Sequence, residues 1–71
     1  MGKLTAVESD AIVAAGYDEH TGVLIVRFRD GGTYEYLEAP RSLFEELLAA
    51  QPHPWSAVGR RVMSHDYRRL D

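Results

Sequence analysis

Cysteine is absent from the 71-residue sequence, and this absence excludes disulfide bonds, zinc–thiolate sites and a cysteine nucleophile. Long apolar runs are absent as well, because no segment approaches the roughly 18 consecutive apolar residues of a membrane-spanning helix. The first ten residues, MGKLTAVESD, lack the apolar core of a signal peptide. Together these absences predict a cytoplasmic protein that does not enter the membrane.

Positive charge is scarce in this chain. It has 8 Lys and Arg residues against 11 Asp and Glu residues, which gives a formal net charge of −3. Four of the basic residues, all arginines, fall within residues 52–71, where only two acidic residues occur. A basic C-terminal end on an acidic body is a candidate anion-binding surface. The alternative is that these arginines are only solvent-exposed side chains on a helix and a tail, and bind no partner.

The remaining composition is that of a small globular domain. Apolar residues make up 45% of the chain and charged residues 27%, which is an ordinary balance for a folded protein. The chain is shorter than a typical domain of roughly 100–150 residues, so its core must be small. We predict a flexible leader over residues 1–9 and a single domain over residues 10–71.

β-Branched and aromatic residues between turn sequences predict three strands, over residues 10–17, 23–29 and 33–37. In the second of these, Leu24, Val26 and Phe28 share one wholly apolar face, which should contact the core. The sequence Asp-Gly-Gly over residues 30–32 joins the second and third strands and is a strong hairpin signal.

Two helices are predicted after the strands. Pro40 suits the start of the first, which should extend to Gln51 before Pro52 interrupts it. Its apolar stripe consists of Leu43, Phe44, Leu47 and Leu48. We expect these four residues to form the core with the apolar face of the second strand.

The second helix should span residues 55–64, with Trp55, Val58 and Val62 on one face and Arg60 and Arg61 outside that stripe. The tail that follows should form a last strand or a docked tail. The predicted fold is therefore α+β: a small antiparallel β-meander packed against one or two helices.

Hairpin register decides the role of the aromatic pair Tyr34 and Tyr36. A two-residue loop would place both rings on the face of Arg27 and Arg29, as a basic stacking surface. A three-residue loop over residues 30–32 would place them on the core face instead, and we favour this register. It pairs Phe28 with Tyr34, Val26 with Tyr36 and Arg27 with Glu35. Both tyrosines are then structural.

Several motifs occur in an order that resembles one known family. They are Gly16-Tyr17-Asp18, Phe28, Gly32, Tyr34-Glu35-Tyr36, Pro40, Leu47 and Tyr67-Arg68-Arg69-Leu70. In this order and spacing they are similar to the KTSC domain, which is named for the C-terminus of some lysyl-tRNA synthetases and also occurs as small free-standing bacterial proteins. The resemblance implies a small α+β domain with no established activity and with RNA or tRNA as the suggested partner.

The arginines of the last third of the chain are the candidate nucleic-acid contacts. We predict that phosphates are contacted by Arg60, Arg61, Arg68 and Arg69, with Tyr67 or Trp55 as the stacking ring. Four phosphate contacts to a single strand would give a log–log salt slope of roughly −3. The alternative is a protein-interaction or structural module, including a homodimer, because the core is limited and Val23, Ile25 and Trp55 are surplus surface apolar residues.

Catalytic and metal signatures are missing from the sequence. His20, His53 and His65 have no metal-ligand spacing, and no serine lies in a nucleophile-elbow sequence. Gly31-Gly32 joins two strands and does not open a helix, so it does not form a phosphate loop. We therefore expect a binding module that is not an enzyme and that has no metal and no cofactor.

Overall fold

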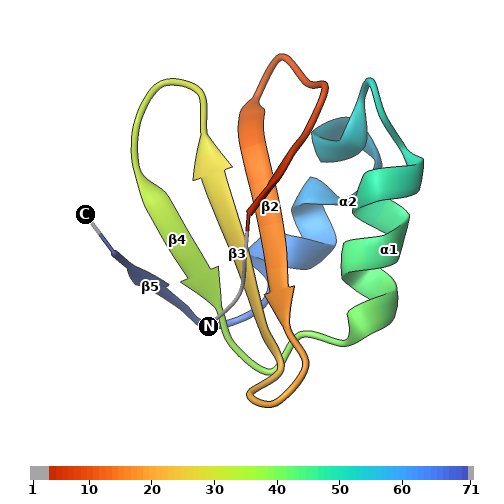
Figure 1. The fold of residues 1–71 in the computed structure, drawn as a ribbon. Helices are drawn as coiled ribbons and strands as arrows, with labels where there is room; N and C mark the ends of the chain where they lie inside the picture. Colours follow the sequence, from red (N-terminus) through yellow and green to blue (C-terminus); the bar gives the residue numbers. More distant parts are fainter. Residues whose placement is uncertain (1–3, 71) are drawn as a thin grey trace.

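The computed structural model describes residues 4–70, which form a five-stranded antiparallel sheet and two helices (Figure 1). The strands are β1 (Thr5–Ala6), β2 (Ile12–Asp18), β3 (Val23–Phe28), β4 (Thr33–Tyr36) and β5 (Tyr67–Arg69), and the helices are α1 (Arg41–Ala49) and α2 (Pro54–Met63). The strands lie side by side in sequence order. The predicted α+β fold, an antiparallel meander packed against helices, is confirmed, and the C-terminal tail forms its last strand.

The N-terminal segment belongs to the sheet. Thr5 and Ala6 pair with β2, and the N–H of Val7 donates a 2.9 Å hydrogen bond to the carbonyl of Val13. Val7 is buried in the core. This differs from the flexible leader predicted for residues 1–9, of which the first three lie outside the described residues. A short strand here satisfies backbone groups of β2 that would otherwise be unpaired.

The core lies between β3 and α1, where the predicted apolar strand face meets the predicted helix stripe. Leu24 and Val26 of β3 and Leu43 and Leu47 of α1 are each at most 3% exposed. The other predicted core residues, Phe28, Phe44 and Leu48, are half-buried and pack against this core. The face assignment is therefore confirmed, and these three residues form the edge of the core.

Strand β2 and helix α2 also contribute residues to the core, and these residues were not among the predicted core residues. Ile12 and Ala15 of β2 are fully buried, and Val58 and Val62 of α2 are at most 1% exposed. The two valines belong to the predicted apolar stripe of the second helix. Their burial shows that α2 covers the sheet together with α1.

The cross-strand pairing between β3 and β4 is shifted by two residues from the predicted register. Val26 lies opposite Tyr34, and Arg27 lies opposite Thr33. The predicted pairs, including Arg27 with Glu35, are therefore wrong. A shift of two residues leaves every side chain on its predicted face, so Tyr34 still lies on the inner face, and so does Tyr36.

The physical reason for the shift is that the turn uses two glycines with positive φ. Gly31 has φ of 110° and Gly32 has φ of 93°. The loop still has three residues, but they are residues 29–31, because the N–H of Phe28 donates a 3.0 Å hydrogen bond to the carbonyl of Gly32. A second glycine in this conformation lets the loop begin one residue earlier than predicted, and moving the loop by one residue shifts each cross-strand pair by two.

Candidate functional site

The sheet extends beyond the helices on one side. In Figure 1 the helices lie beside β2 and β3, whereas β4 and β5 continue past them to the opposite edge. At this edge a pocket of about 550 Å³ opens on the inner face of the sheet. Its aromatic lining consists of Phe28, Tyr34, Tyr36, Trp55 and Tyr67. The seven aromatic residues of the chain are thus concentrated here, since five of them line one pocket.

Three tyrosines form the strand side of the pocket. Tyr34 and Tyr36 alternate on β4 with ring centroids 6.3 Å apart, and Tyr67 lies directly opposite Tyr36 on β5. The ring of Tyr67 is 5.6 Å from that of Tyr34 and 6.2 Å from that of Tyr36. Tyr36 is 5% exposed, whereas Tyr67 is 63% exposed. Tyr67 is therefore the ring that offers the largest open surface to a ligand.

The buried phenol of Tyr36 remains neutral at physiological pH. Burial raises the pKa of this group above its ordinary value, and the neighbouring Tyr34 and Tyr67 raise it further. The stability that the neutral phenol supplies is fully present below about pH 10 and is lost as the pH rises through its folded-state pKa. The part of the pocket wall that Tyr36 forms therefore carries no charge across the physiological range.

Helix α2 supplies the opposite wall through Trp55. The indole packs edge-to-face on Phe28, with ring centroids 5.1 Å apart, and Phe28 packs edge-to-face on Tyr34 at 5.5 Å. Gly59, one helical turn later, makes room for this indole. A Cβ at Gly59 would lie 2.9 Å from the Cδ2 and Cε2 atoms of Trp55.

Replacing Gly59 with alanine should displace the indole of Trp55. Alanine favours a helix over glycine by about 1 kcal/mol, yet the 2.9 Å contact forces the ring to move. We expect a changed emission maximum of Trp55, the only tryptophan in the chain, and no gain in melting temperature. Ser56→Ala on the exposed face of the same helix is the control, and it should leave the emission unchanged. An unaltered emission spectrum in Gly59→Ala would contradict this packing.

Arg69 places one positive charge beside the aromatic rings. Its guanidinium carbon lies 5.6 Å from the ring centroid of Tyr34, in a cation–π arrangement. Gly32 permits this position, since a Cβ there would lie 3.4 Å from Nη2 of Arg69 and 3.1 Å from Cε1 of Tyr34. Within residues 4–70, Arg69 forms no ion pair. Its guanidinium therefore keeps its charge available to a ligand.

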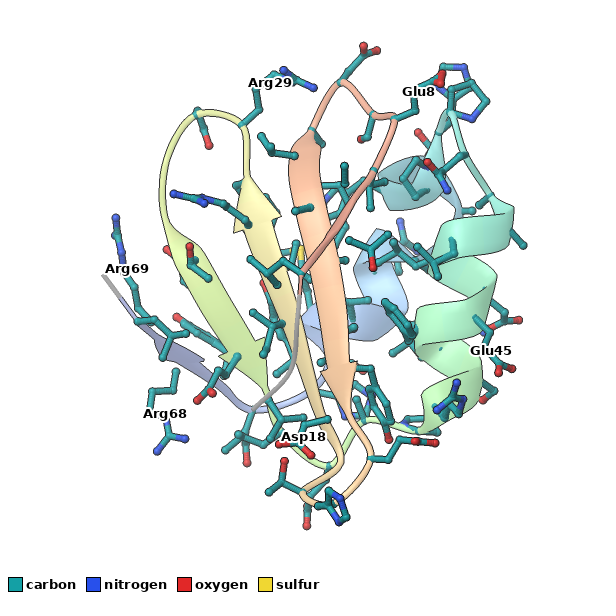
Figure 2. The ribbon with its side chains drawn as sticks, viewed as in Figure 1. Glu8, Asp18, Arg29, Glu45, Arg68 and Arg69 are labelled. Atoms are coloured by element: carbon teal, nitrogen blue, oxygen red, sulfur yellow. The ribbon has the colours of Figure 1, made fainter. Side chains whose placement is uncertain are left out.

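The structure brings three of the six predicted nucleic-acid contacts together, namely Trp55, Tyr67 and Arg69. Arg68 is on the opposite face of β5, and Figure 2 shows its side chain projecting away from that of Arg69. Its Nη2 lies 2.7 Å from Oε1 of Glu35.

The two arginines of α2 lie outside the pocket lining. Arg61 on α2 pairs with Glu46 on α1, with Nη1 and Oε2 2.8 Å apart. Arg60 is exposed on the same helix and has no ion-pair partner within residues 4–70. The four arginines therefore do not form one common surface in the described part of the chain.

Glu35 should couple energetically to Arg68 and not to Arg27. In a double-mutant cycle, Glu35→Gln combined with Arg68→Gln should give a coupling of about 0.2–1 kcal/mol, because the pair is exposed to solvent on the arginine side. The same cycle with Arg27→Gln should give no coupling, since Arg27 lies opposite Thr33. Denaturant unfolding provides the free energies. Coupling to Arg27 alone would indicate the originally predicted register.

Residues that sequence reasoning missed complete the pocket lining. Phe28 was predicted as a core residue and not as part of a site. Asp30 and Met63 also line the pocket, and neither was predicted to contact a ligand. Met63 is 63% exposed. The sequence signal that could have identified Met63 is a large apolar side chain at the end of the second predicted helix, outside its apolar stripe. Tyr34 and Tyr36 were predicted as structural, and they pack on the core and line the pocket at once.

The outer face of the sheet carries a smaller groove of about 300 Å³. Its apolar part is formed by Leu4, Val23, Ile25 and Leu70. Val23 and Ile25 are half-buried there. Among the described residues, neither helix has the length and apolar character needed to cross a bilayer.

Fold and site together define a small α+β domain with an open aromatic pocket at the edge of an antiparallel sheet. The family model of the KTSC domain matches residues 8–53, and the chain belongs to this family. A protein of Tsukamurella paurometabola is 53% identical over 45 residues, which cover 63% of this chain and 67% of that protein. The crystal structure of a KTSC domain protein from Yersinia pestis has the same fold, with a TM-score of 0.79, 23% identity and full coverage of both chains.

Proposed function

We propose that this KTSC domain is a small non-enzymatic module that binds single-stranded RNA, including unpaired segments of tRNA, by stacking a base in the aromatic pocket. The observation that carries this proposal is the convergence of five aromatic side chains in one open pocket of about 550 Å³. Aromatic rings on a sheet surface are a common stacking platform for unpaired bases. The family resemblance implies the same class of partner.

The distribution of charge supports stacking over phosphate binding as the main source of affinity. Arg61 and Arg68 are engaged by glutamates, and Arg69 is the one cationic residue of the described pocket lining. At most one phosphate contact then accompanies the stacked base. We therefore expect a log–log salt slope between 0 and about −0.7 in place of the −3 expected for four contacts.

Trp55 provides a direct test, because the only tryptophan of the chain lies in the pocket. Its fluorescence should be quenched by a single-stranded RNA decamer that contains all four bases, at about 50 and 200 mM salt. A duplex of the same sequence should quench weakly, since its bases are already stacked. Absence of quenching by the single strand, or equal binding of the duplex with a slope near −3, would overturn the proposal.

A second candidate function is protein contact through the outer-face groove. The half-buried Val23 and Ile25 favour it, because they leave apolar surface on the face that no helix covers. Self-association would appear as a concentration-dependent mass in sedimentation equilibrium, abolished by Ile25→Asp. A monomer up to about 100 μM, where a dimer with a Kd of a few μM would be mostly formed, would exclude a homodimer of that strength.

A further inference from the structure

The charged residues of the pocket lie together at one end of it. Asp30 is in the turn between β3 and β4, and both Asp30 and Arg69 line the pocket. The contact between a Cβ at Gly32 and Nη2 of Arg69 places the guanidinium against the same turn. Asp30 and Arg69 therefore lie at the turn end of the pocket, while Tyr67, which lies opposite Tyr36, is farther from the turn.

The spacing along β5 matches the length of a nucleobase. Tyr67 and Arg69 are two residues apart on one face of the strand, which corresponds to about 6.6 Å. A base stacked on the exposed ring of Tyr67 and directed along the strand thus extends toward Arg69 and the turn. Its edge would face the guanidinium and the carboxylate of Asp30.

This pair of groups is selective by its chemistry. A carboxylate only accepts hydrogen bonds, and a guanidinium only donates them. Guanine presents two neighbouring donors, N1–H and N2–H₂, beside the acceptors O6 and N7. Adenine and cytosine present one exocyclic amino group, and uracil would turn carbonyl oxygens toward the carboxylate. Guanine is the base whose edge satisfies both groups most fully.

We propose that the pocket is selective for a single unpaired guanine, with its N1–H and N2–H₂ bound by Asp30 and its O6 and N7 bound by Arg69. This inference rests on the proposed function, because it assigns the base that the RNA inserts. Stacking on Tyr67 supplies sequence-independent affinity, and the two charged residues supply the preference.

Four RNA pentamers test the selectivity: UUGUU, UUAUU, UUCUU and UUUUU, titrated against the full chain with Trp55 fluorescence as the readout. UUGUU should bind at least about tenfold more tightly than UUUUU, which is within the discrimination of a good bidentate contact. Asp30→Asn should reduce this ratio to below about threefold, because it removes the anionic acceptor. Asparagine is well tolerated in turns, so the hairpin should remain folded.

Asp10→Asn is the matched control, since it makes the same charge change at an exposed residue outside the pocket lining. It should leave the ratio unchanged. Equal binding of all four pentamers, or a guanine preference that survives in Asp30→Asn, overturns the guanine assignment while RNA binding by the pocket stands. Failure of every pentamer to bind overturns both the assignment and the proposed function.

Discussion

Replacing Leu47 with alanine should destabilise the domain by about 2–5 kcal/mol. The side chain is completely buried in the core between α1 and the sheet, so its removal leaves a cavity that the small core cannot fill. Domains of this size have a total unfolding free energy near the lower end of about 5–15 kcal/mol. Thermal unfolding followed by circular dichroism should show a melting temperature lowered by many degrees, or no folded state at all.

The matched control for this experiment is Leu70→Ala. Leu70 is 51% exposed, so the same truncation should change the unfolding free energy by less than about 0.5 kcal/mol. If Leu47→Ala melted like the parent protein, the packing of α1 on β3 would be wrong.

Replacing Tyr67 with alanine should weaken binding of single-stranded RNA by about 5- to 150-fold. Loss of one base–aromatic stack costs about 1–3 kcal/mol, and Tyr67 is the ring most open to solvent in the pocket. Because the ring is 63% exposed, its removal should leave the fold intact. Quenching of Trp55 measures the affinity, and circular dichroism measures the fold.

Arg68→Ala distinguishes stacking from general charge attraction. Arg68 is the next residue on β5, but it lies on the opposite face and pairs with Glu35. Its replacement should change RNA affinity by less than about twofold. A larger loss in Arg68→Ala than in Tyr67→Ala would mean that the RNA contacts the outer face and not the pocket.

Local patterns in the sequence were sufficient to predict β2, β3, β4 and both helices, and to identify the inner faces of β3 and α1. The alternation of Leu24, Val26 and Phe28 identified the inner face of β3, and the spacing of Leu43 and Leu47 identified the buried face of α1. These predictions succeeded because each depends only on the periodicity of one element.

Pairing between elements was harder to predict. The hairpin register depended on the backbone conformation of two adjacent glycines, Gly31 and Gly32, and either could have closed a three-residue loop. The pairing of β1 with β2 had no strong local signal, because Thr5 and Ala6 form a strand of only two residues.

The candidate site illustrates the same limit. Tyr67 and Arg69 join Tyr34 only because β5 pairs with β4, and 30 residues separate the two strands in sequence. The sequence predicted one basic surface at the C-terminal end. It did not indicate that Arg68 and Arg69 lie on opposite faces of β5, or that Arg61 forms an ion pair with Glu46. Ion pairs with distant glutamates depend on the packing of whole elements and have no signature in the local sequence.

The central claim is that RNA binds at the aromatic pocket, and an NMR titration of isotope-labelled protein with bulk tRNA tests it most directly. If this claim holds, resonances of Tyr34, Tyr67 and the indole N–H of Trp55 shift progressively, while the amides of Val23 and Ile25 on the outer face remain in place. Shifts confined to Val23, Ile25 and their neighbours, or no shift at any tRNA concentration, would contradict it.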